Sequence, residues 1–139
     1  MIQEQILLQN PHWSTNPIAT FPMTRDLYPD LVKSLSIHPI TYLTGPRRIG
    51  KSVLFQQLMY HLLVHTHLPT KQLLFFSFPP RTPQNTIWEV WRYFHAEICD
   101  PSKPIYLFFD EVQYVKNYEV EIKQLYDMFP NLKICLTGS

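Results

Sequence analysis

A single stretch, residues 44–52, constrains the fold of this chain more than any other. It reads Thr-Gly-Pro-Arg-Arg-Ile-Gly-Lys-Ser and matches the pattern G-x-x-x-x-G-K-[ST] at every fixed position. Such a loop binds phosphate because its backbone N–H groups converge on the anion, a helix begins behind it, and one lysine adds a positive charge. A chance match is expected in roughly one chain in two hundred of this length. The pattern therefore predicts a strand, a phosphate loop and a helix in that order.

Each fixed residue of the pattern has a physical role. Gly45 and Gly50 permit the tight loop, Lys51 would reach the β- and γ-phosphates, and the Ser52 hydroxyl would bind Mg²⁺. The remaining positions of the expected nucleotide-binding set are Pro46, Arg47, Arg48, Ile49 and Val53.

Glycine usage supports this interpretation. The chain has only three glycines, against about ten expected from average usage. Two lie in the loop, and the third, Gly138, lies in a second segment that we expect to face the nucleotide.

Length and charge limit the remaining possibilities. A chain of 139 residues is long enough for one domain with a hydrophobic core and too short for two ordinary ones. Its hydrophobic content of 45% predicts a globular protein. The formal net charge of +1 gives no electrostatic argument for binding nucleic acid or a membrane surface, and excludes neither.

Cysteine usage and hydropathy indicate the compartment. Cys99 and Cys135 are the only cysteines and show no zinc-binding spacing, which favours two reduced thiols. No apolar run reaches the ~18 residues of a membrane span, and no signal peptide is visible at the N-terminus. We therefore expect a cytoplasmic protein.

The N-terminal region is predicted to be an irregular arm over residues 1–24, with a short helix at 2–9. Trp13 lies within this arm. Its indole would either pack over an adenine ring or anchor the arm to the core, and the second role is favoured. A leucine repeat predicts a further helix that begins at about Arg25 or Pro29 and ends at Ser36.

The rest of the chain alternates between predicted strands and helices. Strands are expected at 40–44, 73–78, 105–109 and 132–137, and helices at 53–65, 87–98 and 118–129, the last with Asn117 as N-cap. The 73–78 run is continuously apolar, as in a strand of a parallel sheet that is covered on both faces. The aromatic residues of the second helix recur on one face, which favours a core role over base stacking.

Three histidines, His61, His65 and His67, close the helix that follows the loop. Two of them share a helix face, but the glutamate of a zinc protease motif is missing between them. A solvated helix end is favoured over a metal site.

Polar residues follow two of the predicted strands. Asp110 and Glu111 end the third strand, where a buried acidic pair needs a positive partner. Asp110 would hold Mg²⁺ and Glu111 would act as general base on the attacking water. The alternative is that the pair only caps the next turn. After the fourth strand, Thr137 or Ser139 would contact the γ-phosphate, and the choice between them stays open.

With these segments placed, the chain resembles the ATPase domain of a group of prokaryotic AAA+-like P-loop ATP-binding proteins. In these proteins the domain usually precedes a restriction-endonuclease-like domain of unknown function. The resemblance covers nearly the whole chain. Besides the phosphate loop it rests on Asn10-Pro11-His12-Trp13, Arg25-Asp26-Leu27-Tyr28, the run from Leu107 to Val115, and the run from Leu132 to Ser139.

The resemblance implies an α/β, three-layer P-loop NTPase core with strand order 2-3-4-1, in which the final strand lies between the first and the third. It implies ATP and Mg²⁺ as cofactors, hydrolysis with Lys51, Glu111 and Ser139 as catalytic residues, and residues 1–38 as an arm packed on a core of 39–139. The chain lacks the N-K-x-D signature of GTPases, so ATP is preferred over GTP.

The resemblance also implies segments beyond Ser139. A fifth strand, a helical lid, an arginine finger and a nuclease-like domain would all follow, so we expect the front half of a longer protein, truncated after the strand that carries the γ-phosphate sensor. The first strand would then be an open sheet edge that pairs with a protein partner or with the missing half. An ATP-dependent switch without appreciable turnover, and a DNA-associated role, are the alternative functions.

Overall fold

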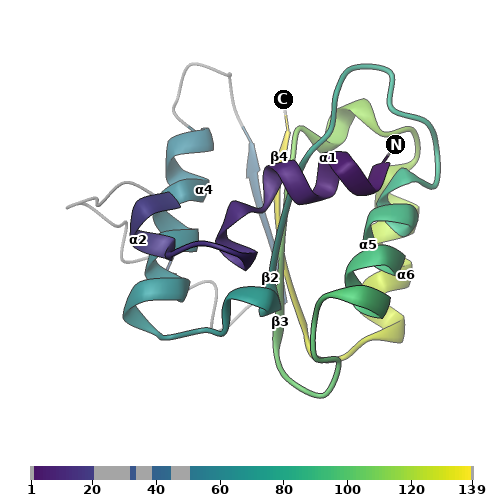
Figure 1. Ribbon diagram of the computed structural model, residues 1–139. Helices are drawn as coiled ribbons and strands as arrows, with labels where there is room; N and C mark the ends of the chain where they lie inside the picture. The colour runs from purple at the N-terminus through teal and green to yellow at the C-terminus, as the bar shows by residue number, and fades with distance from the viewer. Residues whose placement is uncertain (1, 21–31, 34–38, 45–50, 139) are drawn as a thin grey trace.

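The fold is built on a four-stranded parallel β-sheet. The computed structural model describes residues 2–20, 32–33, 39–44 and 51–138. The strands are β1 (Ile40–Thr44), β2 (Leu73–Ser77), β3 (Ile105–Asp110) and β4 (Leu132–Gly138), in the spatial order β1-β4-β3-β2. Figure 1 views this sheet nearly edge-on. All three strand pairs are parallel. The α/β class and the insertion of β4 between β1 and β3 are confirmed.

The helices include α1 (Ile2–Gln9), α2 (Pro17–Thr20), α4 (Lys51–Tyr60), α5 (Thr86–Glu97) and α6 (Tyr118–Met128). Except for α2, these helices agree with the predicted segments to within a few residues; α2 lies in the arm that was expected to be irregular. A π-helical turn, His61–His65, extends α4. Short 3₁₀ turns lie at Pro11–Trp13, Thr70–Gln72 and Val112–Tyr114.

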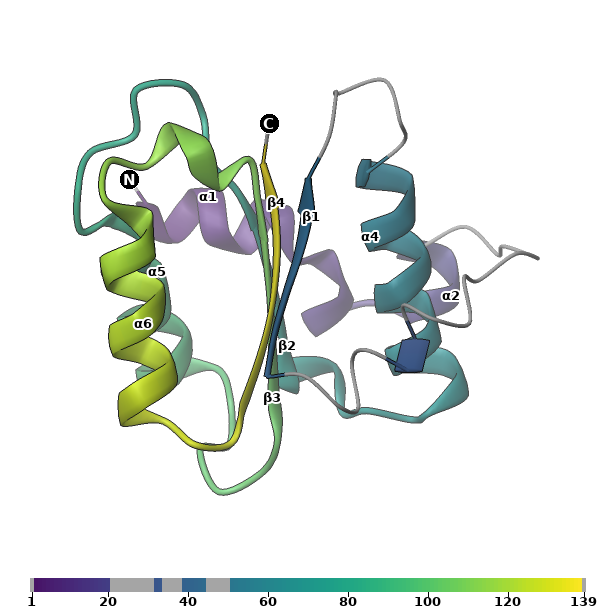
Figure 2. The same cartoon turned by 180° about the vertical axis from the view of Figure 1, so that it is seen from behind.

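Helices cover both faces of the sheet, giving three layers. Helices α5 and α6 lie on one side and α4 on the other (Figure 2). Successive residues of β3 alternate between the two cores: Leu107 and Phe109 pack with the α5 and α6 residues, whereas Phe108 packs with those of α4. Phe108 meets Phe55 edge to face, with ring centroids 5.1 Å apart. Because both faces are buried, the strand is continuously apolar.

Burial in these two cores is the main stabilising contribution. Each fully buried Leu or Phe contributes about 1.5–3 kcal/mol relative to an exposed one. The predicted stripe of the 87–98 segment forms part of the first core, with Ile87, Trp91 and Phe94 all buried. Trp91 and Phe94 of α5 are therefore core residues, as expected.

Two helix starts differ from the sequence-based expectation. Helix α4 begins at Lys51, two residues earlier than predicted. Asn117 does precede α6, but its backbone is left-handed (φ 59°) and its side chain makes no capping hydrogen bond, so the predicted side-chain cap is wrong. The helix expected between residue 25 or 29 and residue 36 lies outside the described residues, except for Val32 and Lys33, which are helical.

Helix α5 receives its cap from a different helix. The carboxylate of Glu121 in α6 accepts hydrogen bonds from the backbone N–H groups of Asn85 and Trp88, each at 3.2 Å. Burial raises the pKa of Glu121. A carboxylate at a helix N-terminus satisfies otherwise unpaired donors, so this contact joins the two helices of the layer.

Trp13 anchors the N-terminal segment to the core. Its indole N–H donates to the carbonyl oxygen of Leu73 at 2.8 Å, and its ring stacks on Phe94 with centroids 5.7 Å apart. These contacts fix the indole beside β2, which agrees with the favoured structural role.

The outer edge of β2 is closed by side chains of the same N-terminal segment. Asn10 donates to the Phe75 carbonyl oxygen at 2.8 Å and accepts from the Phe75 N–H at 2.7 Å. Gln9 accepts from the N–H of Ser77 at 2.7 Å. Helix α1 runs across the strands rather than along them (Figure 1), and Gln9 and Asn10 at its end supply hydrogen bonds that a neighbouring strand would otherwise make.

Both cysteines are free thiols, as predicted. Burial raises the pKa of Cys99 to about 11 and that of Cys135 to about 12. Because the thiolate is the reactive form, a raised pKa lowers the reactivity of both thiols near neutral pH.

The edge contacts make a stability prediction. Asn10→Ala removes the side-chain hydrogen bonds to the N–H and the carbonyl oxygen of Phe75. It also removes the 2.7 Å hydrogen bond from the Asn10 amide to the Ile6 carbonyl oxygen. The free energy of unfolding should fall by about 2–3 kcal/mol, because buried backbone groups lose their partners. Urea unfolding measures it. The exposed control Gln5→Ala on the same helix should change it by less than about 0.5 kcal/mol, and equal effects of the two substitutions would contradict the edge role of Asn10.

Candidate functional site

Lys51 and Asp110 are brought to the same edge of the sheet by the last two described residues of β4. The Lys51 Nζ donates to the Gly138 carbonyl oxygen at 2.6 Å. The Thr137 hydroxyl donates to the Asp110 carboxylate. Since Thr137 and Gly138 are adjacent, the amine and the carboxylate both converge on the carboxyl end of β4. Ligands of open α/β sheets bind at this edge.

Lys51 is the first residue of α4, and its side chain is buried. A buried ammonium needs acceptors, and the Gly138 carbonyl oxygen is one. An ammonium has three N–H donors, so this bond is compatible with further contacts to an anion. The N-terminus of α4 lies beside it and also favours negative charge.

Asp110 ends β3 with its side chain buried and hydrogen-bonded on both oxygens. The hydroxyl of Ser77, its partner in β2, donates to Oδ2 at 3.0 Å, and the hydroxyl of Thr137 in β4 donates to Oδ1. Within the described residues, no lysine or arginine lies at salt-bridge distance from this carboxylate.

These contacts fit a bound divalent cation. A carboxylate offers about four lone-pair positions, and the two hydroxyl donors use two of them. A buried negative charge without a basic partner is stabilised by a cation or by cation-bound water. The remaining lone pairs of the Asp110 carboxylate are therefore suited to binding Mg²⁺.

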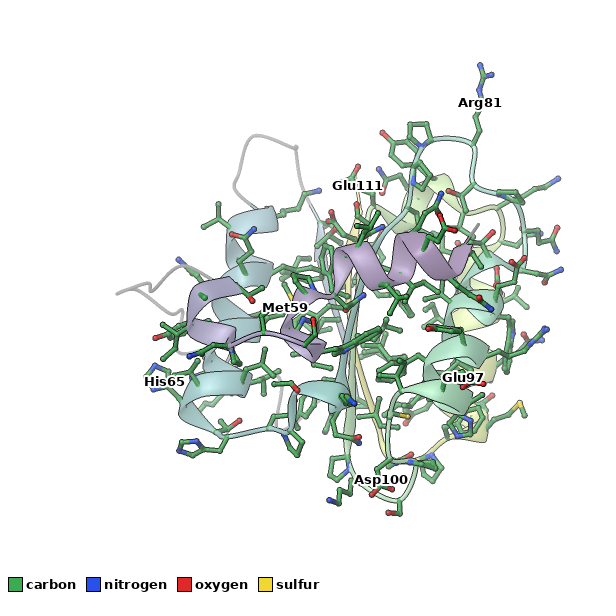
Figure 3. The ribbon with its side chains drawn as sticks, viewed as in Figure 1. Met59, His65, Arg81, Glu97, Asp100 and Glu111 are labelled. Carbon is green, nitrogen blue, oxygen red and sulfur yellow. The ribbon has the colours of Figure 1, made fainter. Side chains whose placement is uncertain are left out.

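Glu111 follows Asp110 in a strained backbone conformation. Its φ of 61° and ψ of 43° place it in the left-handed region, which costs about 1–2 kcal/mol for a non-glycine residue. Its N–H donates to the Thr137 hydroxyl at 3.0 Å, and its carboxylate accepts from the Gln113 amide at 3.0 Å. Glu111 projects at the upper edge of the molecule in Figure 3, opposite Asp100. Glu111 thus lies just beyond the carboxyl end of β3.

Gly138 is closely packed by two side chains. A Cβ atom built there would lie 2.3 Å from the Tyr42 hydroxyl and 3.2 Å from the Gln113 Oε1. Both side chains therefore lie over the end of β4. The crowding at this third glycine comes from side chains and not from an unusual backbone conformation, and its exposure to the nucleotide stays a prediction.

The other predicted site residues divide into two groups. Gly45, Pro46, Arg47, Arg48, Ile49, Gly50 and Ser139 lie outside the described residues, as does the side chain of Ser52. Val53 is described and its side chain is 54% exposed on the first turn of α4. Thr137 is fully buried, and its hydroxyl joins Asp110 to the Glu111 backbone.

Two residues at this edge were not singled out as site residues by the sequence analysis. Ser77 ends an apolar strand, and Gln113 lies two residues beyond Glu111. The signal for Ser77 was a lone hydroxyl at the end of a strand predicted to enter a parallel sheet. Only the strand order places that hydroxyl beside Asp110.

The segment that contains this site matches a known protein family. A family model described as an AAA domain matches residues 37–139, which is more than half of the chain. The chain belongs to the AAA domain family. No curated protein and no solved structure shows a significant match to it.

Family membership identifies the chain as a P-loop ATPase-like domain. The match begins just before β1 and includes β1 to β4 and the helices between them. It thus contains every residue of the site described above.

Two other features of this AAA domain lie away from the site. A hollow of about 660 Å³ is lined by residues such as Pro39, Tyr126 and Leu132, at the amino ends of the strands. It lies at the edge opposite Lys51 and Asp110.

The histidines at the end of α4 are the second feature. His65 and His67 are exposed, and burial together with the neighbouring His65 lowers the pKa of His61. Within the described residues, no group of three or more His, Cys, Asp or Glu side chains forms a metal site.

The described helices were also compared with the length and hydropathy of a membrane-spanning helix. Over residues 2–20, 32–33, 39–44 and 51–138, none of them has the length and apolar character needed to cross a membrane.

The central role of Thr137 is testable by stability. Thr137→Val keeps the side-chain shape but leaves the Glu111 N–H and one Asp110 oxygen without this partner, which should lower the free energy of unfolding by about 1–3 kcal/mol. Thr137→Ser keeps the hydroxyl and removes one methyl group, worth about 0.8 kcal/mol. Chemical denaturation compares the two. If the valine variant were as stable as the serine variant, the hydroxyl would not hold the site together.

Proposed function

We propose that this AAA domain binds ATP with Mg²⁺ and hydrolyses it. The observation that carries the proposal is the convergence of the Lys51 amine and the Asp110 carboxylate on adjacent residues of β4. One group suits a phosphate and the other suits the metal that accompanies it. The family match supports the P-loop ATPase-like class.

The phosphate contacts are assigned to the loop and to the start of α4. Residues 45–50 would supply backbone N–H groups to the phosphate oxygens, and Lys51 would donate to the β- and γ-phosphates. Val53, in the first turn of α4, completes the proposed nucleotide-binding set. The sequence of the loop supports this assignment, together with the buried position of the Lys51 side chain.

The metal contacts are assigned to Ser52 and Asp110. When bound, Mg²⁺ supplies positive charge that neutralises the phosphate oxygens during transfer. Asp110 would hold the metal directly or through water, with its orientation fixed by the hydroxyls on either side. The Ser52 role is supported by its position in the sequence pattern.

Glu111 is assigned the role of general base. It would accept a proton from the attacking water at its carboxylate, and it lies just beyond the carboxyl end of β3. The assignment of the γ-phosphate sensor follows from the use of the Thr137 hydroxyl. Because that hydroxyl already bonds to Asp110 and to Glu111, Ser139 is the better candidate for the sensor.

A second candidate function is an ATP-dependent switch without appreciable turnover. The Gln113 amide donates to the Glu111 carboxylate at 3.0 Å, so one of the two oxygens that a general base would use already has a hydrogen-bond partner. Turnover by the chain distinguishes the two functions. Hydrolysis well above the buffer rate supports an ATPase, and binding without hydrolysis supports the switch.

We also propose that residues 1–38 form an arm and helix packed on an ATP-binding core of residues 39–139. The buried Ile6 joins the same core cluster as β3 and α5, which supports packing of the arm on the core. The hydrogen bonds of Asn10 and Trp13 to β2 give the same support.

The role of Glu111 is tested by Glu111→Gln. The amide has nearly the same shape but does not accept the proton, so hydrolysis should fall by about 10²–10⁴-fold while ATP affinity stays nearly unchanged. Phosphate release and calorimetric titration measure the two quantities. Glu119→Gln, at an exposed position in α6, is the matched control and should retain both. Equal loss of binding and hydrolysis in Glu111→Gln would remove Glu111 from the role of base.

The role of Lys51 is tested by Lys51→Ala. Loss of the ammonium should weaken ATP binding by at least about 10-fold, because a charge-assisted hydrogen bond is worth roughly 1.5–3 kcal/mol. Lys116→Ala, at an exposed position, should bind ATP like the wild type. Unchanged affinity of the Lys51 variant would contradict the phosphate site.

A further inference from the structure

Ser77 and Gln9 form a connection between the N-terminal helix and the proposed metal site. The Ser77 side chain donates to Asp110 at 3.0 Å, and its main-chain N–H donates to the Gln9 side chain at 2.7 Å. Gln9 is the last residue of α1. A residue of the arm therefore lies two hydrogen bonds away from the carboxylate assigned to the metal.

The strand order explains why Ser77 matters for the orientation of Asp110. Strand β3 lies between β2 and β4, and each neighbour contributes one hydroxyl to the carboxylate of Asp110. Two donors on opposite oxygens restrict rotation of the carboxylate group about its terminal bond. With Thr137 as the only donor, that rotation would be less restricted.

We propose that Ser77 is a positioning residue for the metal-binding carboxylate of Asp110, and that Gln9 holds Ser77 in place. The proposal rests on the proposed function, because it assigns Asp110 to the metal. Partners that orient a metal ligand influence metal affinity although they do not touch the metal. Ser77 acts in this way on Asp110, and the arm becomes part of the machinery that sets the Mg²⁺ requirement.

The position of Ser77 favours this role over a purely structural one. Its side chain is only half-buried, so water can replace the hydroxyl as a partner without a large loss of stability. The backbone around it is independently held, because Phe78 N–H donates to the Asp110 carbonyl oxygen at 3.0 Å. Removing the hydroxyl should therefore disturb the direction of the carboxylate more than the fold.

The test measures the affinity of the full chain for ADP and for a non-hydrolysable ATP analogue, in EDTA and over a series of free Mg²⁺ concentrations. Ser77→Ala should raise the Mg²⁺ concentration for half-maximal enhancement by about 10-fold or more. Its affinity in EDTA should match the wild type. Ser77→Thr keeps a hydroxyl and should restore most of the Mg²⁺ response. Circular dichroism establishes that each variant is folded.

The contribution of the arm is measured in the same way. Gln9→Ala should shift the Mg²⁺ requirement in the same direction as Ser77→Ala and by a smaller factor. Gln5→Ala, exposed on the same helix, should leave it unchanged. A Gln9→Ala variant with the wild-type requirement would overturn the assignment of the arm.

Three results for Ser77 are decisive. An unchanged Mg²⁺ requirement in Ser77→Ala, with normal Mg²⁺-dependent binding by the wild type, overturns the positioning role and leaves the proposed function intact. An equal loss of affinity in EDTA and in Mg²⁺ also overturns it, because the effect is then not specific to the metal. A wild-type chain that binds neither nucleotide overturns the proposed function together with this inference.

Discussion

The hydrogen bonds at the end of β4 hold the candidate site together. The Gly138 carbonyl oxygen receives the Lys51 amine, and the Thr137 hydroxyl joins Asp110 to the backbone of Glu111. Lys51 follows the loop after β1, and Asp110 ends β3, so these residues come from distant parts of the sequence. Neighbouring strands lie about 4.8 Å apart. With β4 between them, β1 and β3 are separated by about 10 Å, which is a suitable span for a phosphate group and its metal ion.

The same arrangement stabilises an unfavourable backbone conformation. Glu111 has a positive φ, and such conformations persist where the surrounding structure fixes them. Here its N–H is bonded to Thr137 and its carboxylate to Gln113. The two acidic residues therefore have different positions: Asp110 is held in the sheet as the last residue of β3, and Glu111 lies beyond the end of that strand. Two adjacent carboxylates can take different roles because the chain bends between them.

The sequence predicts most of this fold because the relevant signals are local. Apolar runs ended by proline or polar residues locate β2 and β3, and the stripe containing Trp91 and Phe94 locates α5. The order of the strands followed from a family resemblance rather than from periodicity. The wrong side-chain cap at Asn117 arose because its left-handed backbone replaces the usual capping geometry, and sequence preference does not distinguish the two.

Local signals could not identify the residues that support the site. Ser77 and Asp110 are 33 residues apart, and their contact depends on the pairing of β2 with β3. Thr137 was recognised as a candidate sensor, but its burial against Asp110 depends on the position of β4. Contacts of this kind exist only once the sheet has formed.

The N-terminal segment shows how side chains can take the place of a strand. In a strand, backbone groups on one edge belong to alternate residues, and on the outer edge of β2 these are Leu73, Phe75 and Ser77. Their outward groups bond to Trp13, Asn10 and Gln9 respectively. An edge satisfied by side chains does not offer a free template for another strand. Because the last of these bonds reaches the residue beside Asp110, protection of the edge and orientation of the site depend on the same segment.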